Sequence, residues 1–242
     1  MALKVVISQS MYFPWVGFLE QMRLADVYVR YDDVQFSKGG FTNRVQIKGE
    51  SGSQWLTVPL KKFSLGTPID EIEIDDMQSW QSKHLAMLSN AYSNAPYFQE
   101  MNALVESVFD QRLTCIGDLA YRSQMRLLDY FGLNPALRVM DTKALGILGQ
   151  SSRRVLDIVR HLEGDEYITG HGASNYLDHA LFEHSGVGVQ YMQYQKNSYP
   201  QLHGEFTPYV SALDLVAHCG KQGASYIRST TCSWRQFKHE ST

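Results

Sequence analysis

Hydrophobic and polar positions change their spacing along the chain. Apolar runs at 4–10 and 27–33 flank a helical segment from about Gly17 to Leu24, which predicts a β-α-β unit. Residues 41–48 and 54–62 then alternate apolar and polar positions around the turn-forming segment GESGS, which predicts a β-hairpin. The first quarter of the chain is therefore expected to contribute both parallel and antiparallel strands.

The rest of the chain indicates the fold class. Residues 69–75 alternate and predict an edge strand, and apolar residues from Trp80 to Phe131 recur at helical spacing. Strands are then expected at 137–142, 166–170 and 187–194, with helices at 151–164 and 174–186. Such alternation is typical of parallel sheets. We predict an α/β fold with a mainly parallel sheet flanked by helices, an antiparallel hairpin, and a helical segment inserted at about 80–131, all within one domain of residues 1–242.

Composition and charge narrow the class of protein. The chain is 44% hydrophobic and 19% charged, as in ordinary globular proteins. Its net charge is −3 and its basic residues are scattered, so nucleic acid is not expected as a partner. No apolar run reaches the roughly 18 residues of a membrane span, and no signal peptide is recognisable. The three cysteines form no CxxC pair. We therefore expect a cytoplasmic protein without a membrane span.

Polar side chains gather where the predicted strands end, which is where parallel α/β sheets bind ligands. Gln9 and Tyr12 follow the first strand, although Tyr12 could equally fill the core. Asp32, Asp33 and Gln35 follow the second strand. Adjacent carboxylates could orient a substrate or act as a general base, and they could also simply cap a turn. No histidine lies near them in sequence, so no metal is predicted.

Two other segments could bind an anion. Arg44 lies on the hairpin, where a guanidinium could hold a phosphate or carboxylate, or only keep an exposed strand soluble. Gly170 and Gly172 form a glycine-rich turn, and Ser174 or Asn175 is the expected cap of the helix after it. The turn lacks the third glycine of a dinucleotide fingerprint, and a plain strand-helix connection also explains it.

Chain length predicts that some of these groups meet. The hairpin carrying Arg44 begins eight residues after Asp33, and short connections keep elements adjacent. We therefore expect Asp32, Asp33 and Arg44 to converge on one pocket, where the arginine keeps both carboxylates ionised.

The adjacent His218 and Cys219 resemble a catalytic base and its nucleophile. Neighbours on a helix point about 100° apart, however, and Gly220 is typical of a helix end. Cys219 is accordingly predicted to be structural.

One ordered set of segments extends along most of the chain. It comprises QSMYFPWVGFLEQMRLADVYVRYDDVQFSKGGFTNRVQIK, QWLTVPLKK, WQSKHL, AYSNAPYF, YITGHGASNYLD and YPQLHGEFTPYVSALDL. This set, from about Val5 to Gly220, closely resembles the WbqC-like protein family. Members of that family occur among genes for bacterial O-antigen and other surface polysaccharides, and a glycyl- or acyl-transferring role has been suggested for them.

The resemblance also implies site residues. The family pattern matches Gln9, Tyr12, Asp32, Asp33, Gln35, Asn43, Arg44, His84, Gly170, Tyr176 and Gln201. From the chemistry of an acyl transfer we expect catalytic roles for Asp32 and Asp33, with His84 as an alternative base, and substrate binding by the other matched residues together with Gly172 of the glycine-rich turn. The chain departs from the family at Ser8 and Ser10, where His and Pro are usual, and at His171, where Pro is usual. A catalytic histidine before Gln9 is therefore not expected, and His171 is a poor choice for a general catalyst.

The leading functional hypothesis is a transferase that moves an aminoacyl or other acyl group onto a sugar or sugar nucleotide. It would work on a sugar nucleotide or glycan precursor, with an acyl or aminoacyl carrier protein as a further partner, and without a cofactor. A nucleotide-binding or nucleotidyl-transfer enzyme is the first alternative, although the HxGH signature is absent. A non-catalytic sugar-binding or assembly protein is the second.

Overall fold

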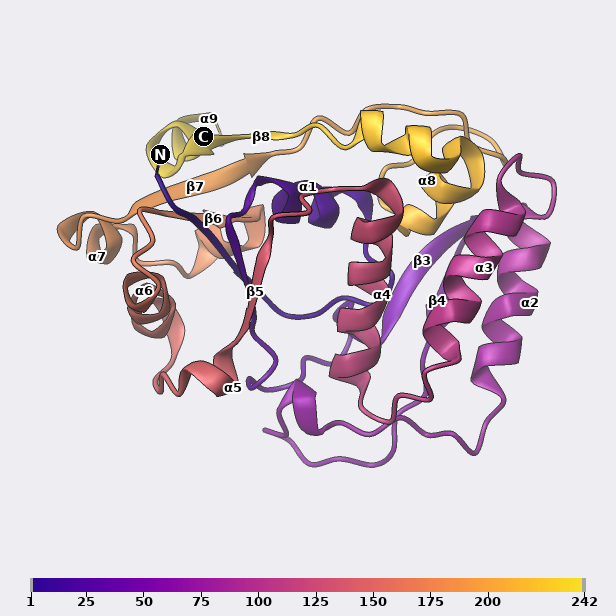
Figure 1. The fold of residues 1–242 in the computed structure, drawn as a ribbon, viewed down its shortest axis with the longest axis horizontal. Coiled ribbons are helices and arrows are strands. Elements are labelled where there is room, and N and C mark those ends of the chain that lie inside the picture. The colour runs from indigo at the N-terminus through magenta and orange to yellow at the C-terminus, as the bar shows by residue number, and fades with distance from the viewer. Residues whose placement is uncertain (1, 241–242) are drawn as a thin grey trace.

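A six-stranded sheet forms the centre of the protein, of which a computed structural model describes residues 2–240 (Figure 1). Its strand order is β5-β2-β1-β6-β7-β8, with every neighbouring pair parallel except β7 and β8. The strands are β1 (Lys4–Ser8), β2 (Val27–Arg30), β5 (Arg138–Asp141), β6 (Glu166–Thr169), β7 (Gly188–Gln193) and β8 (Thr230–Ser233). The predicted α/β class and mainly parallel sheet are confirmed.

The two faces of the sheet carry separate hydrophobic cores. In β1, Val6 faces one core and Val5 the other, and both are fully buried, as a strand covered on both sides requires. The first core is closed by α1 (Val16–Leu24), α4 (Ile116–Phe131) and α8 (Ala212–Cys219), and the second by α6 (Ser151–His161), α7 (His179–His184) and α9 (Trp234–Glu240). A short helix, α5 (Thr142–Leu145), follows β5.

The hairpin and the helical insertion lie beside the main sheet. Strands β3 (Arg44–Gly49) and β4 (Gly52–Thr57) form a separate antiparallel sheet, as predicted. Helices α2 (Trp80–Tyr92) and α3 (Phe98–Phe109) precede α4, and Figure 1 shows these three helices alongside the hairpin on the right of the view. The insertion therefore extends the first core away from the sheet edge.

Two local predictions are wrong. The expected strand at 69–75 is a 3-10 turn, η1 (Ile69–Glu71), followed by isolated bridges, because Ile69 and Ile72 are buried at a spacing of three residues. The expected helix at 174–186 divides into a 3-10 segment, η2 (His171–Asn175), and α7. Asp178 caps α7 by accepting a hydrogen bond from the Leu181 N–H at 3.1 Å, so neither Ser174 nor Asn175 caps the helix.

A buried ion-pair network fixes the carboxyl end of β2. Arg30 and Asp32 are two residues apart in extended chain, so their side chains lie on the same side, with Arg30 Nε 2.5 Å from Asp32 Oδ2. Asp32 also accepts hydrogen bonds from the backbone N–H of Ser10 at 2.8 Å and from its hydroxyl at 2.6 Å. Arg30 continues the network to Asp118 of α4 at 2.8 Å. The loops after β1 and β2 are thereby joined to the first turn of α4.

Close packing at Gly117 accompanies this network. A Cβ at Gly117 would lie 2.9 Å from Arg30 Nη2 and 3.2 Å from Asp32 Oδ2, so only glycine lets the helix come this near. Burial raises the pKa of Asp32, while the hydrogen bonds from Ser10 and Arg30 oppose that rise. Asp32 is 2% exposed and acts as a structural connection.

A buried histidine connects the hairpin, α2 and the loop after β1. His84 Nε2 is 3.2 Å from the Thr57 carbonyl, which can only accept, so Nε2 carries the proton. Nδ1 then accepts a hydrogen bond from the Tyr12 hydroxyl at 3.0 Å. Burial lowers the pKa of His84 from its usual 6.5 to about 4, so the ring is neutral at pH 7.

A helix that crosses a bilayer must be long and apolar, and the helices of this protein can be judged on both properties. Within residues 2–240, none is both long enough and apolar enough to cross a bilayer.

We predict that Asp32→Ala lowers the free energy of unfolding by about 3 kcal/mol, because removing one partner of a buried ion pair leaves the other charge uncompensated. Urea denaturation followed by circular dichroism measures this. The control is Asp157→Ala, which breaks the surface pair with Arg153 and should cost less than about 1 kcal/mol. Equal losses in the two variants would contradict the account.

We predict that stability falls as the pH is lowered from about 6.5 to about 4. In this window the unfolded chain protonates His84 while the folded chain does not, so unfolding takes up a proton. The difference amounts to ~3 kcal/mol across the window. In the His84→Gln variant this loss should be absent, whereas the exposed His161→Gln should behave like the parent protein. An identical pH profile for His84→Gln would show that another group is responsible.

Candidate functional site

The carboxyl ends of β1 and β6 border a cleft of about 700 Å³. The chain continues from β1 to β2 and β5 on one side, whereas β6 and β7 lie on the other, so the strand order reverses between β1 and β6. Parallel α/β sheets bind ligands at such switch points. The cleft is therefore the candidate site.

Aromatic and neutral polar groups make up most of the cleft wall. Its aromatic residues are Trp15, Phe18, Tyr31, Tyr167, Tyr176, Tyr194 and Tyr209, and its polar side chains include Ser8, Gln9, Gln21 and Thr169. No Asp or Glu is among the described residues that line it; the ionisable groups there are Lys196, His171 and tyrosines. Burial raises the pKa of Tyr176 and Tyr194, so both phenols are neutral donors at pH 7. The wall suits a ring-bearing ligand with negative charge.

The turn after β6 forms one side of the cleft. A Cβ at Gly172 would meet no atom within 4 Å, whereas one at Gly170 would lie 3.1 Å from the Tyr194 hydroxyl. His171 Nε2 donates to the Met192 carbonyl at 2.6 Å, which leaves Nδ1 as an acceptor. The turn therefore combines open space at Gly172 with an imidazole ring at the cleft.

The segment after β7 supplies a further part of the wall, next to the turn after β6. Lys196 Nζ donates to the Tyr209 hydroxyl at 2.7 Å and lies 5.0 Å from the centre of that ring. Trp15 packs against Tyr194 and Tyr209 with ring centroids 4.9 and 6.2 Å away. Sequence reasoning missed Tyr194 and Lys196, although they follow a predicted strand and the strand-end rule applies to them equally.

Four of the sequence-predicted site residues line the cleft. They are Gln9, Gly170, Gly172 and Tyr176, which come from the ends of β1 and β6 and from η2. Their side chains or backbone reach the cleft because both strands end at the same edge of the sheet.

The two predicted carboxylates do not line the cleft. Asp32 is held by Ser10 and Arg30. Asp33 is 2.5 Å from Arg154 Nη2 and accepts a hydrogen bond from the Thr142 hydroxyl at 2.7 Å. Each carboxylate has its own arginine, so the structure gives the expected catalytic pair no free carboxylate at the cleft wall, and their catalytic role stays a prediction.

Arg44 does not join these carboxylates. Its Nη2 donates to the Gly39 carbonyl at 2.6 Å, and its guanidinium lies 4.2 Å from the centre of the Trp55 ring. Arg44 forms no ion pair with Asp32 or Asp33, so the ionic contact expected among the three residues is not formed. Arg154, rather than Arg44, is the arginine that pairs with Asp33. Its guanidinium lies 4.9 Å from the ring centre of Tyr31, a wall residue of the cleft.

The remaining predicted residues serve the fold. The Tyr12 hydroxyl bonds His84 Nδ1, and the Thr57 carbonyl bonds His84 Nε2. Because both ring nitrogens have partners, His84 is not available as a base. Asn43 Nδ2 donates to the Val58 carbonyl at 3.0 Å, and the exposed Gln35 bridges to Pro68.

Gln201 belongs to a polar network far from the cleft wall. Its Nε2 donates to Asp214 at 2.9 Å, and its Oε1 accepts from Lys48 Nζ at 3.1 Å. His218 lies nearby, and both its nitrogens are used: Nε2 accepts from the Leu202 N–H at 2.9 Å and Nδ1 bonds the Asp214 carbonyl at 2.8 Å. His218 therefore has no lone pair with which to activate Cys219, which stays a predicted structural residue.

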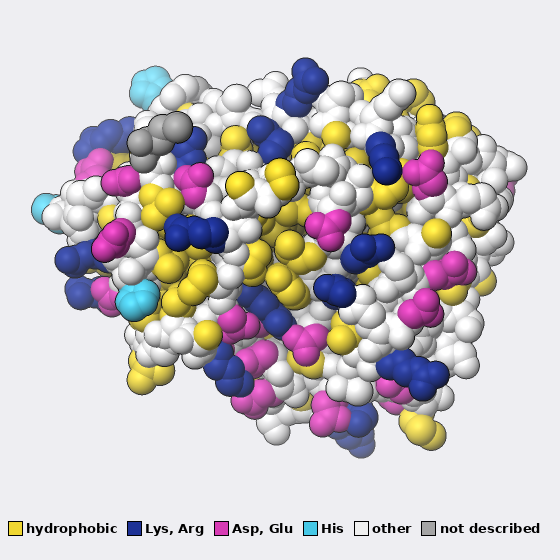
Figure 2. Space-filling model, viewed as in Figure 1, with side chains coloured by type: hydrophobic (Ala, Val, Ile, Leu, Met, Phe, Trp, Pro, Cys, Tyr) yellow, Lys and Arg dark blue, Asp and Glu magenta, His cyan; other side chains and the backbone are white. Residues whose placement is uncertain are grey.

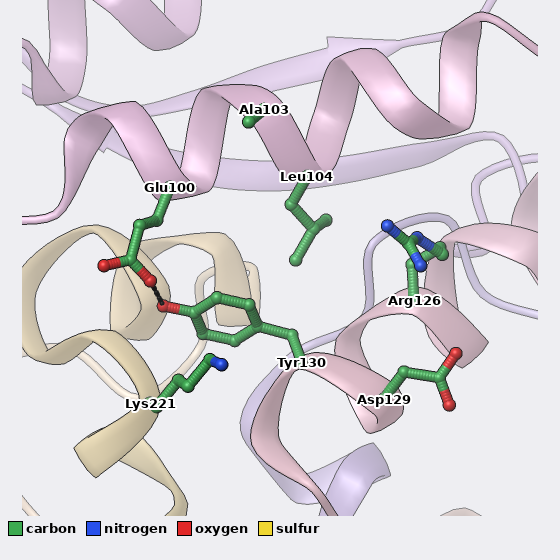
Figure 3. A pocket seen from close by; sticks show the side chains of 7 residues that line it. All are labelled: Glu100, Ala103, Leu104, Arg126, Asp129, Tyr130 and Lys221. Atoms are coloured by element: carbon green, nitrogen blue, oxygen red, sulfur yellow. Dashed lines mark hydrogen bonds between the residues drawn. The ribbon is translucent and has the colours of Figure 1, made fainter.

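Other described parts of the surface were also candidates for a site. Among residues 2–240, no group of three metal-binding side chains is present. Figure 2 shows positive and negative side chains intermixed on the face in view. A separate hollow of about 380 Å³ lies between α3, α4 and η3 (Gly220–Tyr226), where Tyr130 donates to Glu100 at 2.6 Å and Lys221 lies below the ring (Figure 3). It lies against helices rather than at strand ends, and its charges are mixed.

The amino-acid sequence of the chain is similar to those of known proteins. A protein of Mycobacterium tuberculosis (strain ATCC 25618 / H37Rv), the uncharacterized protein Rv1507c, is 30% identical over 228 residues, which cover 93% of this chain and 97% of that protein. No solved structure gives a significant match. The profile of the WbqC-like protein family matches residues 9–226. The chain therefore belongs to the WbqC-like protein family.

Proposed function

We propose that the protein is a transferase that moves an acyl group onto a sugar or sugar nucleotide in bacterial surface-polysaccharide biosynthesis. The acyl group is an aminoacyl group, such as glycyl, or another acyl group. The observation that carries this proposal is the cleft at the switch point between β1 and β6, whose wall is aromatic and contains Lys196 and no carboxylate. Such a wall favours a ligand that combines rings with phosphate charge.

The cleft offers a partner for each part of a sugar nucleotide. Aromatic rings such as Trp15 and Tyr176 can stack on a base or sugar. Lys196 can pair with a phosphate, and the open space at Gly172 lets a ligand approach the backbone. The side-chain amide of Gln9 can hydrogen-bond a sugar hydroxyl.

We assign the base to His171, which reverses the expectation from the family pattern that this residue is a poor choice for a general catalyst. His171 lines the cleft and its Nε2 bonds the Met192 carbonyl, so Nδ1 is the ring nitrogen left to take a proton, whereas Asp32 and Asp33 are held by arginines outside the wall. In the proposed reaction Nδ1 removes the proton from the acceptor amine or hydroxyl as that atom bonds to the acyl carbon. The imidazolium then returns the proton to the leaving group as the donor's acyl bond breaks. This assignment replaces the sequence-based choice of an aspartate.

A non-catalytic sugar-binding protein is the second candidate. It is favoured by the ion pairs that neutralise Asp32 and Asp33, because a binding protein needs no free carboxylate. A magnesium-dependent nucleotidyl transferase is less well supported, since the described cleft residues offer no carboxylate to hold the cation.

We predict that the protein acylates an amino-sugar nucleotide, as detected by mass spectrometry of UDP-linked amino sugars incubated with acyl and aminoacyl thioesters. His171→Gln should reduce turnover at least ~100-fold, because it removes the base, while ligand affinity changes little. Binding without turnover across the donors would favour the binding-protein alternative. Full turnover in His171→Gln would exclude this histidine as the base.

We predict that Gly172→Val weakens binding of UDP-N-acetylglucosamine at least ~10-fold without lowering thermal stability. The new side chain would occupy open space in the cleft and collide with the ligand rather than with the protein. The matched control is Gly188→Val, at the first residue of β7 and outside the cleft wall, where the atoms nearest to a new Cβ lie 3.6 Å away. Calorimetric titration gives the affinities. Unchanged affinity in Gly172→Val would place the nucleotide elsewhere.

A further inference from the structure

A second hollow opens beside the switch-point cleft. It has a volume of about 380 Å³ and lies between the loop after β1 and the hairpin, which contributes Val45, while Phe41 precedes it. Met11, Trp15 and Tyr209 line both this hollow and the cleft. Because the two spaces share these walls, one ligand can extend from the cleft into the hollow.

The lining of the hollow is almost entirely hydrocarbon and aromatic. The Tyr12 hydroxyl is bonded to His84, and the Tyr209 hydroxyl accepts from Lys196, which keeps the tyrosine oxygens partnered within the protein. Gln46 supplies the remaining polar side chain of the described lining. An apolar group gains from leaving water here, whereas a charged group would lose its hydration without a partner.

The size of the hollow selects among acyl groups. A water-sized or methylene-sized group takes up about 30 Å³, so the hollow has room for on the order of ten such groups. An acetyl or glycyl group would leave most of this space without contacts, and the ammonium of a glycyl group would find no carboxylate among the described lining residues.

Resting on the proposed function, we infer that the hollow takes the hydrocarbon chain of the transferred acyl group, and that this chain is longer than that of an acetyl group. The polar part of the same ligand occupies the cleft, and Met11, Trp15 and Tyr209 surround the point where the two parts join. The substrate class is thereby narrowed from any acyl group to aliphatic ones longer than acetyl.

The test compares UDP-glucosamines that carry acetyl, hexanoyl and decanoyl groups, by calorimetric titration. The hexanoyl ligand should bind on the order of 100-fold more tightly than the acetyl one, since each buried methylene contributes about three- to fourfold. Gln46→Phe, which adds an aromatic ring on the hairpin side of the hollow, should abolish this preference while leaving acetyl affinity within about threefold. Phe41→Ala removes a half-exposed wall and should weaken only the longer ligands; the remote, exposed Leu65→Ala is its control.

Sodium decanoate, titrated alone, separates the failure of this inference from that of the proposed function. Binding of decanoate that is lost in Phe41→Ala, with no binding of any UDP-sugar, would support the hollow and contradict the sugar-nucleotide site. Equal affinity for acetyl and hexanoyl ligands, with no decanoate binding, would overturn the inference and leave the proposed function standing. A loss in Phe41→Ala that is the same for all chain lengths would also overturn it.

Discussion

The buried ion pair between Arg30 and Asp32 is the constraint on which the arrangement of the site depends. Arg30 connects β2 to α4 through Asp118, and Asp32 holds Ser10 of the loop after β1. That loop supplies Met11 and Trp15 to both the cleft and the hollow. The charges at this strand end therefore fix the position of the walls.

A second ion pair likewise holds a wall residue of the cleft in place. Arg154 neutralises Asp33 and lies against Tyr31, so an ion pair positions an aromatic wall from behind. With the carboxylates held outside, the groups left at the cleft are Lys196, His171, amides and phenols. This pattern lowers the cost of bringing a phosphate into a partly desolvated space, because no like charge opposes it.

Period and strand-end rules predicted the fold class, the hairpin, the helical insertion and the cleft residues Gln9, Gly170 and Gly172, because these follow from local pattern and sheet direction, whereas Tyr176 came from the family resemblance. They failed where tertiary partners decide. Nothing in the sequence near Asp33 indicates Arg154, which lies 121 residues away. The apolar spacing of 69–75 reflected packing of a 3-10 turn rather than strand pairing. His84 matched the family pattern, yet burial makes it a structural residue.

The central claim is that the cleft between β1 and β6 binds the substrate. A crystal structure of the protein soaked with UDP-N-acetylglucosamine tests it most directly. The account predicts that the phosphates lie near Lys196 and the turn at Gly172, with a ring of the ligand against the aromatic wall. Ligand density in the hollow between α3, α4 and η3, with the switch-point cleft unoccupied, would contradict it.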